Sequence, residues 1–567
     1  MISFRRAVVL LAAAAAAAPY ARAVDRTEGQ PFATRSVVYA RHGIAASAQP
    51  LASRIGVAVL ERGGTAVDAA IAVNAALAVL EPVSCGLGGD LFAIVRDPKT
   101  GELVGLDASG RSPLALTPDK IRANPDGTIP LYSPYSWTVP GAADGWFELH
   151  RRFGRLPMKE LLAPAIRLAE EGAPVPQVIA GAWARSERVF RDKPGFAEVF
   201  LPGGRAPREG EVFRNPALAR TLRLLAEKGR DAYYDGPIAA AIVAYSRKVG
   251  GFFSPEDFRR HHSDWTTPIK TTYRGAEVYE LPPSGQGLAT LEMLNILETF
   301  DLRGMGRAST DFWHVFVEAK KLAFADRARY YADPAFAATP IATLLDKEYA
   351  KRRAALIDMK RAALVEPPPD AALGHGDTTY LATADAEGMV VSLIQSNYTG
   401  FGSGYVVPEL GFGLQDRGGQ FALDPKHPNV QAPGKRPFHT IIPGFLARGA
   451  TVCAFGVMGG ATQPQGQAQI VVNLVDFDMN IQEAGDAPRF VHEGSSEPTG
   501  TSMKDGGNLG LESGVDEGAR RGLAARGHRI VPMPGNFGGY QAVCRDLATG
   551  VLSGASESRK DGAAIGY

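Results

Sequence analysis

A threonine that follows a cleavable loop is the residue on which the chemistry of this chain depends. Thr378 stands between VEPPPDAALGHGD, a segment rich in proline, glycine and alanine, and a run from Thr379 that alternates like a β-strand. Such a segment predicts a loop that can be cut without unravelling a neighbouring element. A hydroxyl at the first residue of a strand is suited to act as a nucleophile once cleavage frees the α-amino group beside it.

The strand after Thr378 predicts a second hydroxyl opposite the first. The run YLATAD is followed by a tripeptide loop that ends at Gly388, and then by the β-rich run MVVSLIQSN. A three-residue hairpin loop with Gly388 in the left-handed conformation pairs Asp385 with Met389. Counting back along this register places Ser396 opposite Thr378, where its hydroxyl can hold the nucleophile.

A pair of glycines is the third element with chemical potential. The apolar run CAFGVM ends at Gly459 and Gly460. Two successive backbone N–H groups without side chains can bind the oxyanion of a tetrahedral intermediate. A plain turn at the end of a strand is the alternative explanation for the same residues.

These residues fall within ordered motifs that span most of the chain. The motifs are GLGGD (86–90), FGSG (401–404), PGKRPFHTIIP (433–443), MGGATQPQGQ (458–467) and DAPRF (486–490). Together they resemble the gamma-glutamyltransferase (glutathione hydrolase) family, whose members are N-terminal-nucleophile hydrolases. The resemblance implies an α+β fold, a four-layer αββα sandwich, and a precursor that cuts itself between Asp377 and Thr378.

The resemblance also implies how the site works and what it needs. Thr378 attacks the carbonyl of Asp377, leaving a large subunit (24–377) and a small subunit (378–567) that share one core. No cofactor is required. The freed α-amino group, with an unperturbed pKa of about 7.7–8.0, is the general base. Ser396 supports the hydroxyl, the glycine pair forms the oxyanion hole, and water or an amine accepts the acyl group of a small-molecule amide.

The acyl pocket departs from the family pattern at three positions. Counting from FGSG, Tyr398, Arg417 and Gln420 occupy places where the family has an Asn, a Gln and an Asp around the substrate α-amino group. The carboxylate partner of a substrate ammonium is therefore lost. A pocket that gains an arginine and lacks the acid favours an anionic or neutral polar acyl group over an amino acid.

The residues for the substrate carboxylate differ as well. The paired serines of the family become His439 and Thr440, both still able to form hydrogen bonds. Arg111 is the candidate for the arginine that grips the α-carboxylate in the family, and a solvated loop arginine is the alternative. The loop before Gly434 is short, which predicts an open site in which water competes with amines.

Three functions remain open at this point. The first is hydrolysis of gamma-glutamyl or related acyl amides, favoured over transfer. The second is hydrolysis of a dicarboxylate monoamide, or an acylase activity, of the oxamate amidohydrolase or cephalosporin acylase type. The third belongs to another class, an exported solute-binding protein, which would have no reason to cut itself at Asp377.

The N-terminal segment predicts export. Residues 1–23 contain Arg5 and Arg6, a short apolar run and the sequence Ala-Arg-Ala, the layout of a signal peptide cleaved after Ala23. We therefore expect a periplasmic or secreted protein. The 567 residues carry a net charge of +1 and are 45% hydrophobic, which gives no reason to expect a nucleic-acid or membrane partner.

Other chemistry has weak support in the sequence. The three cysteines, Cys85, Cys453 and Cys544, are interpreted as small buried residues rather than a disulfide framework. No histidine, cysteine and carboxylate cluster occurs at ligand spacing, so no metal site is expected. A GxSxG motif is absent, which excludes an α/β-hydrolase nucleophile elbow.

The elements that must position these residues can be outlined from periodicity. Residues 46–80 predict two helices, broken at Gly63 and Gly64, with Thr65 capping a second helix that is apolar all round. From residue 141 to 357 the chain is predicted to be mostly helical, with short strands near 269–273 and 278–281. The helices are expected near 143–153, 158–171, 215–228, 237–249, 288–300 and 311–332.

Overall fold

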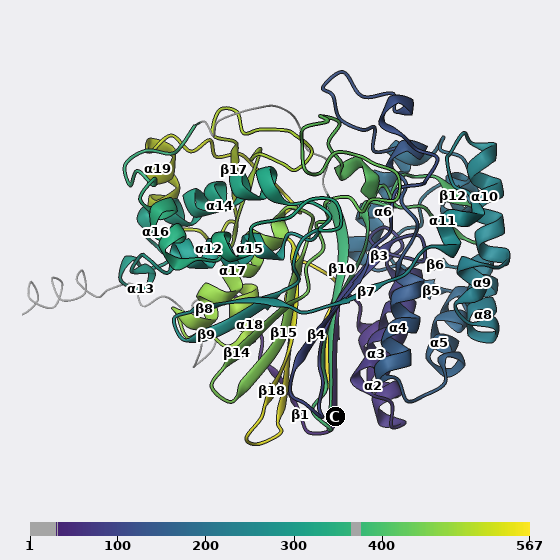
Figure 1. The fold of residues 1–567 in the computed structure, drawn as a ribbon. Helices are drawn as coiled ribbons and strands as arrows, with labels where there is room; N and C mark the ends of the chain where they lie inside the picture. The colour runs from purple at the N-terminus through teal and green to yellow at the C-terminus, as the bar shows by residue number, and fades with distance from the viewer. Residues whose placement is uncertain (1–29, 31, 365–375) are drawn as a thin grey trace, which may run out of the picture.

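The computed structural model describes residues 30, 32–364 and 376–567. The predicted signal peptide (1–23) and most of the loop before Thr378 lie outside the described residues. The predicted four-layer αββα sandwich is confirmed: two sheets face each other, and a layer of helices covers the outer face of each (Figure 1).

Each central sheet has seven antiparallel strands. The first sheet runs β20 (Ala563–Gly566), β2 (Gly43–Ser47), β10 (Gly376–Asp385), β11 (Val390–Thr399), β3 (Asp90–Arg96), β4 (Leu103–Ala108) and β7 (Asp264–Thr266). The second sheet runs β1 (Val38–Ala40), β19 (Leu552–Ser556), β18 (Gly539–Asp546), β15 (Thr451–Met458), β14 (Gly444–Arg448), β9 (Ala276–Glu280) and β8 (Ile269–Tyr273). Three small ribbons pair β5 (Ala173–Pro174) with β6 (Val212–Phe213), β12 (Val406–Val407) with β13 (Phe412–Gly413), and β16 (Phe490–Glu493) with β17 (Asn508–Leu511).

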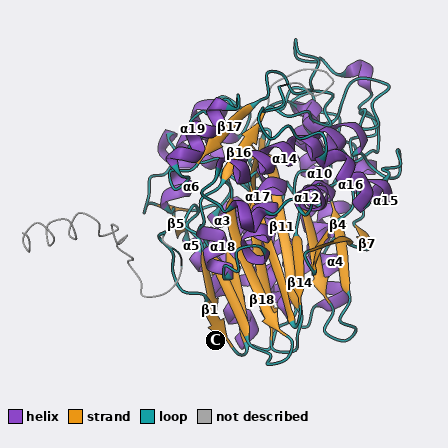
Figure 2. Ribbon diagram, turned by 90° about the vertical axis from the view of Figure 1, so that its left-hand side faces the viewer, coloured by secondary structure: helices purple, strands orange, loops and turns teal. Residues whose placement is uncertain are grey.

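The helices divide between the two outer layers. On the side of the first sheet lie α2 (Pro50–Glu61), α3 (Ala66–Leu80), α4 (Ala142–Phe153), α5 (Met158–Glu171), α6 (Gln177–Phe190), α7 (Phe196–Phe200), α8 (Pro216–Lys228), α9 (Asp231–Tyr234), α10 (Pro237–Lys248) and α11 (Pro255–Arg259). On the other side lie α12 (Gly287–Leu297), α13 (Leu302–Met305), α14 (Thr310–Tyr330), α15 (Ile341–Leu344), α16 (Lys347–Ala354), α17 (Thr462–Val475), α18 (Ile481–Asp486) and α19 (Glu517–Ala525). In Figure 2, α17 and α18 lie in front of the strands of the second sheet. Short 3₁₀ turns occur at Pro118–Lys120, Pro134–Ser136, Pro202–Gly204 and Arg417–Gln420.

The central helix α3 explains why the first sheet is buried on both faces. All fifteen residues of α3 are buried, as its all-round apolar sequence predicts. Its start is fixed by a capping box in which the Asp68 N–H donates to Thr65 and the Thr65 N–H donates to Asp68. The strands on which the candidate nucleophile lies are therefore held between two apolar layers.

The segments on either side of Thr378 are interleaved in both sheets. In the first sheet β10 and β11 lie between β2 and β3, and in the second sheet β14 lies between β15 and β9. A cut before Thr378 would thus leave two chains joined by backbone hydrogen bonds on several strand edges. This is the physical basis for expecting one shared core.

The predicted helices largely agree with the structure, with two differences. All six helices predicted after residue 141 are present, within a few residues of the expected bounds. The first helix begins at Pro50 rather than near Ala46, because residues 43–47 pair as β2 and proline is favoured in a first helical turn. Helix α6 was not predicted, nor were the short helices α7, α9, α11, α13, α15 and α16.

The cysteine prediction was wrong for two of the three residues. Cys453 of β15 and Cys544 of β18 are directly paired neighbours in the second sheet, and their sulfurs form a disulfide. Cys85 is buried with a free thiol, as expected. Three cysteines far apart in sequence gave no framework pattern, and only the strand pairing brings two of them together.

A search of the described residues finds no helix with both the length and the apolar character needed to cross a bilayer.

Candidate active site

Thr378 lies at a β-bulge between β10 and β11. Thr379 pairs with Gln395 and Asp377 pairs with Tyr398, so Thr378 between them faces two residues of β11. One of them is Ser396, and the two side-chain oxygens are 3.4 Å apart. The predicted register holds from Asp385 back to Thr379 and shifts at Thr378, yet the predicted approach of the Thr378 and Ser396 side chains is present. The bulge is a local feature that a simple count along the strands could not find.

The hydroxyl of Ser396 is held from several sides. The Tyr398 N–H donates to its Oγ at 2.7 Å, and the Arg417 guanidinium donates to the same atom at 3.2 Å. Ser396 is fully buried and Thr378 is 1% exposed. The Ser396 oxygen is therefore fixed in place next to Thr378.

Gln463 is a site residue that the sequence analysis missed. Its side-chain amide donates to Thr378 Oγ1 at 3.4 Å, and its Oε1 accepts from the Ile442 N–H at 3.0 Å. Gln463 lies in the first turn of α17, directly after the glycine pair. Its place in the MGGATQPQGQ motif was the available signal. Thr378 Oγ1 is thus flanked by a hydroxyl on one side and an amide on the other.

The glycine pair presents two backbone donors just before Gln463, the residue that contacts Thr378. Gly459 and Gly460 both have positive φ, of 116° and 55°. Their carbonyls accept from the N–H groups of Thr462 and Gln463. Within the described part of the chain, the N–H groups of the two glycines have no protein acceptor. A side chain at either position would be strained, and the two N–H groups are available to an oxyanion.

Arg417 occupies the centre of the predicted acyl pocket. Its guanidinium donates to Thr440 Oγ1 at 2.6 Å and to Ser396, and it stacks over the Tyr398 ring at 4.4 Å. Burial lowers the pKa of Arg417 to about 10, which leaves the group charged at neutral pH. The structure therefore brings Arg417, Tyr398 and Thr440 together with Ser396 and Thr378.

Gln420 and Asp416 complete this side of the pocket. The Gln420 amide donates to the Tyr398 hydroxyl. Both carboxylate oxygens of Asp416 accept hydrogen bonds from Thr399, through its N–H and its hydroxyl. Burial raises the pKa of Asp416 to about 7. Asp416 is thus committed to Thr399 and does not replace the acid that the sequence lacks at Gln420.

His439 lies beside the pocket and is already bonded within the protein. Its Nε2 is 3.0 Å from Asp90 Oδ2, its Nδ1 faces the Ile441 N–H at 3.4 Å, and its ring packs on Phe92. Burial lowers its pKa well below the usual range and raises that of Asp90 to about 7. Of the pair predicted for the substrate carboxylate, Thr440 contacts Arg417, whereas both nitrogens of His439 have protein partners.

The GLGGD turn packs directly against β11, the strand that carries Ser396. A Cβ on Gly89 would lie 2.4 Å from the Ser396 carbonyl oxygen, and one on Gly88 would lie 1.8 Å from the Gly413 carbonyl oxygen. Only glycine permits this approach. The glycines of this turn therefore have a structural role, with Asp90 at the end of the turn.

Arg111 is not part of this network. Its guanidinium pairs with Asp264 at 3.1 Å and donates to the His262 carbonyl. It lines a separate cavity of about 590 Å³, with Phe92, Arg436 and several prolines among the other lining residues. The side chain of Arg111 is turned toward β7, and its contact with a substrate stays a prediction.

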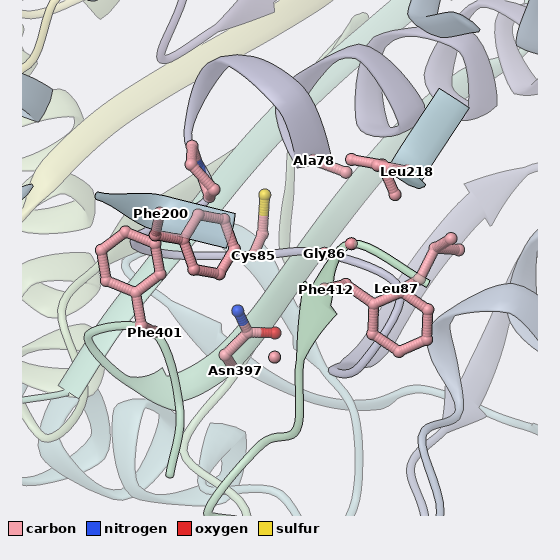
Figure 3. A pocket seen from close by; sticks show the side chains of 12 residues that line it. Ala78, Cys85, Gly86, Leu87, Phe200, Leu218, Asn397, Phe401 and Phe412 are labelled. Carbon is pink, nitrogen blue, oxygen red and sulfur yellow. The ribbon is translucent and has the colours of Figure 1, made fainter. Parts of the chain in front are cut away.

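A second, very small cavity lies behind β11. It has a volume of about 10 Å³, and Cys85, Phe401 and Asn397 are among its lining residues (Figure 3). The Asn397 side chain points into it, and its Oδ1 has no protein partner in the described chain. The space suits one water molecule. The Cys85 thiol faces this cavity among apolar groups, and burial raises its pKa well above the usual value.

The structure also groups residues that the sequence did not suggest as a cluster. His314 and Glu318 of α14 meet His528, with their ligand atoms within 4.8 Å of one another. Spacing in the sequence did not indicate this cluster, because its third member comes from a distant segment. The Lys321 ammonium already binds Glu318 Oε1 at 2.8 Å, and the two histidines face each other at 2.8 Å. Internal hydrogen bonds therefore satisfy this group.

The short loop before Gly434 predicted an open site, but the candidate site of the uncut chain is not open to solvent. Thr378 and Arg417 are almost completely buried. The reason is that β10 continues upstream of Thr378 in the uncut chain, so Thr378 is an internal strand residue.

The family model and the relatives found by comparison with known proteins point to the same family. The gamma-glutamyltranspeptidase family model matches residues 52–567. The chain is 37% identical over 521 residues to the glutathione hydrolase-like YwrD proenzyme of Bacillus subtilis, covering 91% of this chain and 97% of the relative. It is 35% identical over 536 residues to the oxamate amidohydrolase proenzyme of Klebsiella pneumoniae, covering 93% and 98%.

Solved structures agree with these sequence relatives. The crystal structure of cephalosporin acylase from Bacillus halodurans superimposes with a TM-score of 0.86 at 41% identity, covering 96% of this chain and 99% of that one. The crystal structure of gamma-glutamyltranspeptidase from Helicobacter pylori gives a TM-score of 0.53 at 31% identity, over 58% of this chain and 94% of that one.

Proposed function

Because the chain belongs to the gamma-glutamyltranspeptidase family of N-terminal-nucleophile hydrolases, we propose that it is a self-processing amidohydrolase with Thr378 as its nucleophile. The observation that carries this proposal is the surroundings of Thr378 Oγ1, which lies 3.4 Å from both Ser396 and Gln463. Gly459 and Gly460, whose N–H groups have no acceptor among the described residues, begin the turn that carries Gln463. A solute-binding protein is dropped as an alternative, since the family consists of enzymes.

Maturation would be an N-to-O acyl shift followed by hydrolysis. The Thr378 hydroxyl adds to the carbonyl carbon of Asp377, and the C–N bond to Thr378 breaks as its nitrogen takes up a proton. The resulting ester is hydrolysed by water, which leaves a carboxylate on Asp377 and a free amine on Thr378. The products are a large subunit ending at Asp377 and a small subunit, residues 378–567. No cofactor enters these steps.

Turnover would then use the same atoms. The α-amine of Thr378 takes the proton of its own hydroxyl as the oxygen attacks the substrate amide. The N–H groups of Gly459 and Gly460 stabilise the tetrahedral oxyanion, and Ser396 orients the attacking oxygen. The leaving amine takes the proton from the α-amine. Water then cleaves the acyl ester, and because the loop before Gly434 is short, we propose that hydrolysis outruns transfer to an amine.

The acyl pocket supports a preference for anionic or neutral acyl groups. Arg417 offers a buried positive charge beside Ser396, while Gln420 and the Thr399-bound Asp416 offer no free carboxylate to a substrate ammonium. A glutaryl or similar dicarboxylate monoamide fits this chemistry better than a gamma-glutamyl amide. The relatives named as an oxamate amidohydrolase and a cephalosporin acylase agree with this second function, and the one named glutathione hydrolase-like agrees with the first.

A hydrolysis screen of the purified mature protein tests this proposal. Glutathione, a glutaryl anilide and oxamate are offered in parallel, with Thr378→Ala as the control. We expect release of amine from at least one amide by the wild type and none by the variant. Equal rates for both proteins would remove Thr378 from the reaction, and a strong preference for glutathione would reject the proposed acyl pocket.

We also propose that the protein is exported to the periplasm or outside the cell. The signal-peptide pattern of residues 1–23 and the Cys453–Cys544 disulfide support this, since structural disulfides persist in oxidising compartments. Cell fractionation and N-terminal sequencing of the large subunit test it. We expect a mature chain beginning at Val24 in the exported fraction; an intact Met1 in the cytoplasm would contradict it.

A further inference from the structure

We propose that Gln286, a residue of the large-subunit segment, positions both the oxyanion glycine Gly460 and the acyl-pocket residue Thr440. This role rests on the proposed function of Thr378. Gln286 does not touch the nucleophile, so its effect passes through the backbone of the two residues that it holds. It is therefore a positioning residue rather than a catalytic one.

The geometry shows one side-chain amide joining two parts of the site. Gln286 Nε2 donates to the Thr440 carbonyl at 2.7 Å and to the Gly460 carbonyl at 2.9 Å. Gln286 is fully buried, and both hydrogens of its amide are used. The backbone next to Gln286 is joined to the backbone next to Thr440 as well: the His439 N–H donates to the Ser284 carbonyl at 2.9 Å.

The orientation of this amide is fixed from behind. Arg327 of α14 donates to Gln286 Oε1. Arg327 is itself fully buried, forms an ion pair with Glu497, and stacks on Phe324 and Phe438. Since the Oε1 faces an arginine and the Nε2 faces two carbonyls, only one orientation of the amide satisfies every partner.

The two carbonyls are connected to the reacting atoms by short paths. The Gly460 carbonyl also accepts from the Gln463 N–H, and the Gln463 side chain donates to Thr378 Oγ1. Thr440 Oγ1 accepts from Arg417, which donates to Ser396. A rotation of the peptide after Gly460, or a shift of Thr440, would thus change the surroundings of Thr378. A misplacement of about 1 Å at such a distance can lower a rate by about a hundredfold.

Replacing Gln286 by leucine tests the positioning role. The two measurements are kcat and the rate of self-cleavage. Leucine is similar in size to glutamine, but its side chain is apolar and donates to neither carbonyl. We expect kcat of the processed protein for a glutaryl anilide to fall about ten- to a hundredfold, with a smaller change in KM. We also expect the half-time of self-cleavage to lengthen by a similar factor, since both reactions use the same donors.

Gln286→Glu gives a signature that a purely structural role does not predict. The carboxylate keeps the contact with Arg327 but points an oxygen, without a proton, at the two carbonyls. Only the protonated acid can donate to one of them. The ratio of variant to wild-type kcat should therefore rise as the pH is lowered. A ratio that stays constant with pH would contradict the proposed contacts.

Gln469 is the matched control. It is buried, and its amide donates to the carbonyls of Gln465 and Phe490, away from Thr378. Gln469→Leu should lower the melting temperature about as much as Gln286→Leu, yet leave kcat within about threefold of wild type.

The outcomes separate the two proposals. An active wild type with Gln286→Leu and Gln286→Glu unchanged in kcat and in self-cleavage would overturn the positioning role alone. A wild type that neither cleaves itself nor hydrolyses an amide would overturn the proposed function, and this role with it. Equal losses in Gln286→Leu and Gln469→Leu would also reject the specific role of Gln286.

Discussion

Two arginine sites in this molecule differ in how their charge is balanced. Arg417 is fully buried and donates to two hydroxyls, and no carboxylate among the described residues lies within salt-bridge distance of it. Arg111 and Arg436, beside the larger cavity, both pair with Asp264. The first arginine can receive an anionic group from outside the protein, whereas the other two already share a carboxylate partner in Asp264.

An arginine near a motif is therefore a weak guide to substrate binding. Removing a charged group from water is costly unless another group compensates it. Arg417 has hydroxyls and the Tyr398 ring as partial compensation, and a substrate carboxylate would complete it. At Arg111 the protein supplies the anion, so a substrate would have to displace Asp264.

The largest expected effect within the Arg417 region is that of Ser396→Ala. The variant removes the hydroxyl that contacts both Thr378 and Arg417. We expect processing and turnover to slow by roughly ten- to a thousandfold, measured by the half-time of cleavage and by kcat. Unchanged rates would mean that the 3.4 Å approach of the two hydroxyls has no catalytic role.

Replacing Arg417 and Arg111 separately tests which of the two arginines binds the acyl group. Arg417→Gln should lower kcat/KM for a glutaryl anilide by about a hundredfold, since hydrogen bonds to charged groups contribute about 1.5–3 kcal/mol each. Arg111→Gln should change it less than threefold, because Asp264 keeps Arg436 as its partner. Similar losses in both variants would show that the cavity at Arg111 also holds the acyl group.

Substrate preference is a further test of the charge that the Arg417 pocket offers. Without an acid at Gln420, we expect kcat/KM for a glutaryl amide to equal or exceed that for the gamma-glutamyl amide. Gln420→Asp places a carboxylate next to Tyr398 and should shift the ratio toward the gamma-glutamyl substrate by about tenfold. A wild type that strongly prefers the gamma-glutamyl amide would contradict the description of Arg417 as the dominant charge.

The smallest effect concerns Asp416, the buried carboxylate next to Arg417. Burial raises its folded pKa from 3.8 to about 7. The stability contributed by its neutral form is thus present below pH 4 and is lost as the pH rises through about 7. Asp416→Asn keeps an acceptor for the Thr399 N–H and does not ionise.

The melting temperatures of the two proteins should therefore diverge between about pH 4 and pH 7, with the wild type losing more stability than Asp416→Asn. The measurement is the difference in melting temperature across that range. A constant difference would indicate that Asp416 is ionised throughout, and would make it a second anion available to Arg417.

The nucleophile region could be predicted in detail because local patterns determine it. Strand alternation and the hairpin loop at Gly388 placed Ser396 opposite Thr378, and the glycine pair lies at the end of β15 as expected. The layers followed from the family resemblance and from helical periodicity. These features depend on residues close in sequence, or on motifs long enough to be specific.

The second half of the site depends on contacts between distant segments. Arg111 was assigned from the family resemblance, but β7, more than 150 residues away in sequence, supplies the aspartate that pairs with it. Gln286 and Gln463 reach the site only after α12 and α17 pack on the second sheet. The Cys453–Cys544 disulfide arises in the same way, from the pairing of β15 with β18. No local period predicts such contacts, and a motif pointed only to Gln463.

The most direct test of the central claim is the identity of the first residue of the smaller fragment. Purified protein is incubated until any cleavage is complete, the fragments are separated, and the smaller one is sequenced from its N-terminus. The account predicts two fragments, with the smaller beginning at Thr378, and an uncut chain for Thr378→Ala. A wild-type chain that stays intact, or a fragment that begins at another residue, would contradict it.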